Sequence, residues 1–191
     1  MTLGQFLFKY RSYAPIPWVI VMIIFATPTP TSLVAGFLVA CAGECLRAWG
    51  VMYAGSETRV TGSGVGASRL VTSGPFSHTR NPLYIGNMLI YTGIGIMSYA
   101  LFPWLQLGAL CWFVFQYSLI VRDEEAFLRR QFGAEYEAYV RAVPRFFFRL
   151  TRYTPPVVIT IDWKAGWHSE QRTIQAFVLA SAIVFVLWLI R

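Results

Sequence analysis

Residues 73–86 read S-G-P-F-S-H-T-R-N-P-L-Y-I-G and form the densest run of chemically capable side chains in the sequence. Pro75 and Pro82 fix their own φ angles and bias the residues before them away from helix, which predicts an irregular backbone up to residue 81. Proline is favoured in the first turn of a helix, and asparagine is a favoured N-cap. The stretch therefore predicts a helix that begins at Pro82, with Asn81 as its N-cap.

Four hydrogen-bonding side chains surround this predicted helix start: His78, Arg80, Asn81 and Tyr84. The N-terminus of a helix attracts carboxylates and phosphates, because its first N–H groups lack partners within the helix. The cluster can therefore bind an anionic ligand. A basic stretch before an apolar helix is also typical of an anchor at the membrane interface, and these residues alone leave both interpretations open.

The composition indicates a membrane protein. Of the 191 residues, 56% are hydrophobic and 13% are charged, and the mean hydropathy is +0.51. A soluble domain does not have this balance, whereas a polytopic membrane protein does. We expect a single all-α integral membrane domain over residues 1–191. Its five predicted transmembrane helices cover residues 14–27, 31–53, 82–100, 104–121 and 173–190.

Two connections between these helices are informative. Only L-F-P separates the third predicted helix from the fourth, which predicts a tight antiparallel hairpin. Residues 122–143 place apolar side chains at helical spacing among charged ones, which predicts an amphipathic helix on the membrane surface. A polar loop is expected over residues 54–81, and an irregular basic and aromatic segment over residues 144–172.

The positions of the basic residues predict the orientation. The formal net charge is +7, and every Lys and Arg except Arg191 falls in residues 1–13, 47–81 or 122–172. By the positive-inside rule these regions are cytoplasmic, so the N-terminus is expected inside and the C-terminus outside. Basic residues that flank apolar helices suit an anionic membrane surface better than nucleic acid. No group of Cys and His residues has the spacing of a metal site, so no metal is expected.

A second polar cluster, Arg122-Asp123-Glu124-Glu125, follows the fourth predicted helix. Its carboxylates can bind ribose hydroxyls or an ammonium group, and Arg122 can bind a carboxylate through two hydrogen bonds. Acidic residues in the first turn of a helix also complement the helix dipole, which is the alternative explanation. The predicted hairpin would bring Arg122 to the same membrane face as Pro82.

The two clusters together resemble a known family. The first is S-G-P-F-S-H-T-R-N-P-L-Y-I-G-N, and the second continues as R-D-E-E-A-F-L-R-R-Q-F-G-A-E-Y-E-A-Y-V-R-A-V-P-R-F. They are similar to the isoprenylcysteine carboxyl methyltransferases, whose relatives include membrane phospholipid methyltransferases. The resemblance covers about Val71–Phe146. It implies that S-adenosylmethionine binds from the cytosol, that S-adenosylhomocysteine is the product, and that a lipophilic acceptor enters from the bilayer. The compact chain is typical of bacterial members, which predicts the bacterial cytoplasmic membrane.

The resemblance also implies a cofactor-binding core over residues 71–146 and leaves the predicted helix 173–190 as an addition to it. The implied cofactor-binding residues are His78, Arg80, Asn81, Pro82, Tyr84, Gly86, Glu124, Glu125 and Tyr136. Asn81 stands where eukaryotic members have histidine, so no role that depends on a histidine can be transferred to this position.

The nature of the acceptor decides which residues are catalytic. An ionised carboxylate needs only orientation by a cation, for which Arg122 or Arg145 is the candidate. An amine or a phenol also needs a base, for which His78 or Glu125 is the candidate. We expect a carboxylate acceptor and the catalytic residues Arg122, Glu125 and Arg145. The alternatives are N-methylation of a phospholipid or amine, a sterol-type reductase with a nicotinamide cofactor, and a membrane scaffold without activity.

Overall fold

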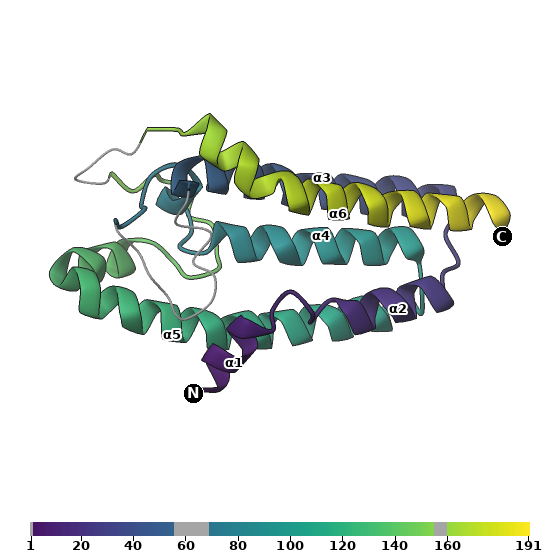
Figure 1. Cartoon of the computed structure of the whole chain (residues 1–191), viewed down its shortest axis with the longest axis horizontal. Helices are drawn as coiled ribbons and strands as arrows, with labels where there is room; N and C mark the ends of the chain where they lie inside the picture. The colour runs from purple at the N-terminus through teal and green to yellow at the C-terminus, as the bar shows by residue number, and fades with distance from the viewer. Residues whose placement is uncertain (1, 56–68, 155–159) are drawn as a thin grey trace.

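The computed structural model describes residues 2–55, 69–154 and 160–191, and every regular element within these ranges is helical (Figure 1). The all-α fold class is therefore confirmed. Residues 56–68 of the predicted polar loop lie outside the described ranges. In chain order the elements are α1 (Leu3–Lys9), α2 (Ile16–Ile24), α3 (Pro30–Ala54), the 3-10 turn η2 (Gly74–Ser77), α4 (Pro82–Ser98), α5 (Trp104–Ala142) and α6 (Trp163–Ile190).

Three helices of the described ranges, α3, α5 and α6, are long and apolar enough to cross a membrane. Helix α2 has 9 residues and α4 has 17, so both are shorter than a typical crossing helix. In Figure 1 these two run along the same long axis as the other three. The protein is therefore a helical membrane protein, and the count of five crossings stays a prediction.

Local sequence explains where α3 and α4 begin. At α3, the Thr29 side chain accepts a hydrogen bond from the Ser32 backbone N–H (3.1 Å), and Ser32 Oγ accepts one from the Thr29 N–H (2.9 Å). This reciprocal pair is a capping box. Helix α4 begins at Pro82, as predicted. Asn81 occupies the N-cap position, but its side chain does not cap the helix; it donates instead to the carbonyl oxygen of Arg145 (3.0 Å).

Helices α3 and α4 pack closely because glycines face each other at two levels. A Cβ atom at Gly43 would lie 2.7 Å from the carbonyl oxygen of Gly86, and one at Gly86 would lie 2.8 Å from that of Gly43. Seven residues away on each helix, Gly36 and Gly93 form an equivalent pair, with corresponding distances of 2.4 and 2.6 Å. Small residues allow membrane helices to approach backbone to backbone. We call these four residues the glycine seam.

Helix α5 differs from the prediction of a separate amphipathic helix over residues 122–143. The helix continues without a break through the acidic residues that follow its apolar part, residues 104–121. Its direction changes only at Gly133, which has φ +49° and ψ −121° (the fold-back of α5 in Figure 1). Glycine adopts a positive φ easily because it has no Cβ atom. An ion pair between Arg129 and Glu137 (2.9 Å) joins the two arms of the fold-back.

Helix α6 begins ten residues earlier than predicted, so the expectation of an irregular chain up to residue 172 was wrong for residues 163–172. The Asp162 side chain caps the helix by accepting a hydrogen bond from the Ala165 N–H (2.9 Å). The polar first turns also contain Glu170, whose carboxylate pairs with Arg47 of α3 (2.7 Å). The prediction relied on hydropathy, which is low over these polar turns, although they already belong to the helix.

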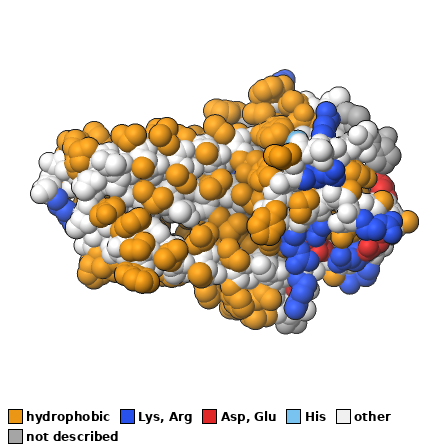
Figure 2. Space-filling model, turned by 180° about the vertical axis from the view of Figure 1, so that it is seen from behind, with side chains coloured by type: hydrophobic (Ala, Val, Ile, Leu, Met, Phe, Trp, Pro, Cys, Tyr) orange, Lys and Arg blue, Asp and Glu red, His pale blue; other side chains and the backbone are white. Residues whose placement is uncertain are grey.

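Surface chemistry divides the molecule along its long axis. Figure 2 shows hydrophobic side chains along most of the visible face, whereas Lys and Arg side chains gather mainly at one end. Large apolar side chains on several helices are exposed, among them Ile20, Leu38, Leu179 and Val186. Such a surface suits the hydrocarbon core of a bilayer. The basic end also contains the polar cluster described next.

Candidate active site at the basic end of the helices

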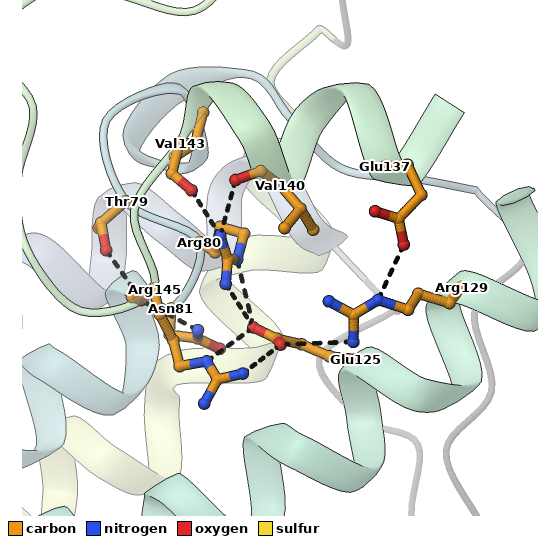
Figure 3. A network of polar contacts seen from close by, with 9 residues as sticks. All are labelled: Thr79, Arg80, Asn81, Glu125, Arg129, Glu137, Val140, Val143 and Arg145. Carbon is orange, nitrogen blue, oxygen red and sulfur yellow. Dashed lines mark hydrogen bonds and ion pairs between the residues drawn. The ribbon is translucent and has the colours of Figure 1, made fainter. Parts of the chain in front are cut away.

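The centre of the polar cluster is Glu125, whose exposed fraction is 2% (Figure 3). Arg80 donates to Glu125 Oε1 through Nη2 (2.8 Å) and Nε (3.2 Å). Arg145 donates to the same oxygen through Nε (3.0 Å) and to Oε2 through Nη2. Burial alone would raise the pKa of Glu125, but the hydrogen bonds from Arg145 and Arg80 outweigh burial, and the pKa lies below its usual value. Glu125 is therefore ionised at neutral pH.

Arg80 also holds the two halves of the site together. Its Nη1 atom donates to the carbonyl oxygens of Val140 (3.1 Å) and Val143 (2.6 Å), at the end of α5 (Figure 3). Its backbone N–H donates to the carbonyl oxygen of Pro144 (2.9 Å). One arginine thus joins the segment before α4, the fold-back of α5 and the carboxylate of Glu125.

The segment that follows α5 packs against residues 78–81 through further backbone contacts. The carbonyl oxygen of Arg145 accepts hydrogen bonds from Thr79 Oγ1 (3.3 Å) and Asn81 Nδ2 (3.0 Å). The Arg149 N–H donates to the His78 carbonyl (3.0 Å), and His78 Nδ1 lies 3.0 Å from the Arg149 carbonyl oxygen. The polar atoms of His78 and Asn81 therefore join two loops.

Glu124, the neighbour of Glu125, has a different environment. It accepts a hydrogen bond from the hydroxyl of Tyr84 on α4 (2.7 Å). Burial raises the pKa of Glu124 to about 7, although the Tyr84 hydroxyl and the positive charge of Arg11 act in the opposite direction. The pKa values of two adjacent carboxylates are thus shifted in opposite directions. Such pairs are characteristic of sites in which one acid holds a charge and the other exchanges a proton.

The structure places the remaining predicted residues as follows. Tyr136 lies beyond the fold-back, 1% exposed, with the Arg129 guanidinium 5.9 Å from its ring centre. Pro82 is buried at the start of α4, and Gly86 belongs to the glycine seam. The Arg122 side chain is 65% exposed, and its Nε atom lies 3.9 Å from Oδ1 of Asp123. The structure therefore does not bring Arg122 to Glu125.

Two arginines near the acidic pair were not predicted. Arg129 Nη1 lies 3.8 Å from Glu125 Oε2, four residues along the same helix, so i,i+4 spacing was a signal for it. Arg11 comes from the segment after α1, where it stacks over the ring of Phe8 (3.8 Å). No spacing in the sequence relates Arg11 to Glu124, because the packing of the N-terminal segment brings it there.

Comparison with known proteins gives the family. Residues 31–135, more than half of the chain, match the family model described as phospholipid methyltransferase. The chain belongs to the phospholipid methyltransferase family. The match extends from α3 into the fold-back of α5 and includes Arg80, Tyr84 and the acidic pair, whereas Arg145 and α6 follow it.

Two curated relatives of this family member carry names that refer to metal resistance. The cobalt-zinc-cadmium resistance protein CzcN of Cupriavidus metallidurans (strain ATCC 43123 / DSM 2839 / NBRC 102507 / CH34) is 34% identical over 125 residues, 65% of this chain and 53% of the relative. The nickel-cobalt-cadmium resistance protein NccN of Alcaligenes xylosoxydans xylosoxydans is 36% identical over 93 residues, 48% of this chain and 41% of the relative. The chain spans about half the length of these relatives, or less. No solved structure matches it.

Proposed function

We propose that this protein is an integral membrane methyltransferase that uses S-adenosylmethionine and methylates a lipophilic acceptor. The observation that carries the proposal is the acidic pair, in which Arg80 and Arg145 hold Glu125 ionised while the Tyr84 hydroxyl donates to Glu124. The pair lies within the part of the chain that matches the phospholipid methyltransferases. The basic residues around it support a cytoplasmic site by the positive-inside rule.

The chemistry of these side chains fits S-adenosylmethionine, whose sulfonium supplies an activated methyl group. Glu124 has acceptor capacity beyond its bond to Tyr84, so it can bind an ammonium or lie near a sulfonium. The Arg145 and Arg129 side chains, 39% and 42% exposed, can donate to a carboxylate. Glu125 is almost fully buried and already accepts four hydrogen bonds. We therefore assign Glu125 to positioning the arginines instead of direct contact with ribose.

A row of aromatic rings supports entry of the acceptor from the bilayer. The Tyr84 ring centre lies 4.6 Å from that of Tyr117, which lies 5.9 Å from Phe113, which in turn lies 4.6 Å from Tyr91. The row leads from Glu124 to a small apolar cavity. The cavity is lined by Pro15, Trp18, Val19, Met22, Tyr91, Ile94 and Phe113. An apolar tail that enters here by displacing these side chains would place its polar head toward Glu124 and keep water away from it.

The acceptor atom can be a carboxylate oxygen, as the resemblance to isoprenylcysteine carboxyl methyltransferases implies, or an amine nitrogen. One observation favours the amine. Of the two arginines expected to orient a carboxylate acceptor, Arg145 is already paired with Glu125, and Arg122 is exposed and pairs with Asp123. Glu124, by contrast, can take up the proton that an ammonium group must lose before its nitrogen can attack the methyl carbon. N-methylation is therefore the second candidate.

Calorimetric titration of the purified full-length protein tests the proposal. S-adenosylhomocysteine should bind and a reduced nicotinamide should not. Glu124→Gln should weaken S-adenosylhomocysteine binding by about 1.5–3 kcal/mol, the scale of a hydrogen bond to a charged group. Glu135→Gln, at an exposed position on the same fold-back of α5, is the matched control and should bind normally. Binding of the nicotinamide alone would overturn the methyltransferase proposal in favour of a reductase.

Transfer of a labelled methyl group to extracted lipids separates the two acceptors. A methyl ester releases its label as methanol after mild alkaline hydrolysis, whereas an N-methyl group keeps it. Alkali-labile product would support the carboxylate acceptor, and alkali-stable product the amine. Transfer of the label to a water-soluble product, and not to lipid, would refute a lipophilic acceptor while leaving the methyltransferase proposal intact.

A further inference from the structure

A short segment after α5 exposes large apolar side chains in a way that methyl transfer does not explain. Residues 145–152 read R-F-F-F-R-L-T-R, and we call them the apolar-basic loop. The exposed fractions are 82% for Phe147, 48% for Phe148 and 98% for Leu150. The sequence from residue 144 to 161 contains no Asp or Glu. Neighbouring large apolar side chains with this exposure, beside arginines, indicate a contact with an apolar and anionic surface.

The position of the loop identifies that surface. Its Arg149 carbonyl contacts His78, whose ring centre lies 6.2 Å from that of Trp49 near the end of α3. Helix α6 begins beside the same end of α3, and its Trp163 and Trp167 are 64% and 58% exposed. Exposed tryptophans at the ends of membrane helices are characteristic of the headgroup region. The loop therefore lies at the end of the helices where the bilayer meets water.

We propose that the apolar-basic loop docks on the anionic lipid headgroups of the leaflet that adjoins the candidate active site. Phe147, Phe148 and Leu150 enter the headgroup region, and the exposed Arg152 contacts lipid phosphate. Basic side chains close to an anionic leaflet are attracted to it, and ionic strength weakens that attraction. The lipid surface thus covers apolar side chains that the described part of the chain leaves exposed.

Docking would also support the candidate active site, because the loop and the site share residues. Arg145, the first residue of the loop, binds Glu125 through its guanidinium group. Its carbonyl oxygen accepts hydrogen bonds from Thr79 and Asn81. A loop held by lipid would keep Arg145 at Glu125. This second consequence rests on the proposed function, whereas the docking itself does not.

Fluorescence of a labelled loop tests the docking. Leu150→Cys is made in a full-length background whose native cysteines, Cys41, Cys45 and Cys111, are replaced by alanine, and it is labelled with a polarity-sensitive dye. The protein is reconstituted in vesicles of phosphatidylcholine, with or without phosphatidylglycerol. We expect a blue shift that grows with phosphatidylglycerol and shrinks in high salt. Emission typical of water in both kinds of vesicle would overturn the proposal. It is the result expected if a soluble protein, and not lipid, covers the loop.

A matched control and a second readout complete the test. The same dye at Glu137→Cys, on the fold-back of α5, should show no dependence on lipid charge. Arg152→Gln should reduce the phosphatidylglycerol-dependent part of the blue shift at residue 150, and an unchanged shift would contradict the role of Arg152. S-adenosylhomocysteine affinity should rise with phosphatidylglycerol in the wild type and much less in Leu150→Ser. If the ligand does not bind at all, the proposed function fails while the fluorescence result still decides the docking.

Discussion

Replacement of Glu125 by glutamine is the most direct test of how the site is built. The amide keeps the shape of the side chain but removes the negative charge that Arg80 and Arg145 share. It also replaces one acceptor oxygen by an NH₂ group that faces guanidinium donors. The Arg80 side chain is only 10% exposed, so water cannot replace the lost carboxylate. Removal of one partner from a buried ion pair costs about 3–5 kcal/mol, and we expect Glu125→Gln to lose stability on this scale.

The matched control uses another ion pair of the same helix. Glu137 pairs with Arg129 at 2.9 Å, but both side chains are exposed, by 48% and 42%. Exposed pairs contribute about 0–1 kcal/mol, so Glu137→Gln should unfold almost like the wild type. The two variants make the same chemical change, and burial is the main difference between them.

Thermal unfolding in one detergent, followed by tryptophan fluorescence, measures both variants, and denaturant titration supplies the free energies. Glu125→Gln should melt well below Glu137→Gln. Equal melting temperatures would show that Glu125 is not the buried centre of the arginine cluster. A double variant that also carries Arg145→Gln should lose less than the sum of the single losses, because the second change removes one of the uncompensated charges.

Three further expectations follow from the same contacts. The pKa of Glu124 is about 7 in the folded state and about 4.3 in the unfolded state, so the folded state binds the proton more tightly. Stability should therefore rise as the pH falls from about 8 to 5. Melting curves of Glu124→Gln at several pH values should lack this rise. Among acceptors that differ only in tail length, each buried methylene should improve apparent binding by up to about 0.8 kcal/mol until the cavity is filled, and a flat response in turnover would contradict entry from the bilayer. Single cysteines at residues 2 and 191 should react with impermeant reagents from opposite sides of the membrane, and reaction from the same side would mean that the number of crossings is even.

The elements that were predicted correctly depend on short-range chemistry. Pro82 marks the start of α4 because its ring suits the first turn of a helix, whatever surrounds it. The limits of α3 and its apolar length could likewise be read from the sequence. The start of α6 was missed because hydropathy was used to locate it, although Asp162 is a recognisable N-cap. Gly133 was missed because glycine can lie within a helix, and only tertiary contacts decide that the chain folds back there.

The sequence identified several side chains of the polar cluster but not how they contact one another, and it gave Arg122 a place that the structure does not. The sequence places Arg80, Tyr84 and the acidic pair in two motifs, and the structure joins them through side-chain contacts. Spacing could not show that Glu125 is buried among arginines while Glu124 contacts a tyrosine, since both residues have the same chemistry in the sequence. That difference arises from the loop after α5, which brings Arg145 from twenty residues away.

The glycine seam determines which side of α4 is able to open. At Gly43 and Gly86 the carbonyl oxygen of each helix lies within 2.8 Å of the place where a Cβ atom of the other would be, so α3 and α4 approach too closely for side chains to separate them. We therefore expect these two helices to move together. On the opposite side of α4, side chains of α2 and α5 surround the apolar cavity, and side chains can change rotamer where backbones cannot shift. For the proposed lipophilic acceptor, we therefore expect a lateral passage between α4 and either α2 or α5, and a crosslink between α3 and α4 should leave that passage working.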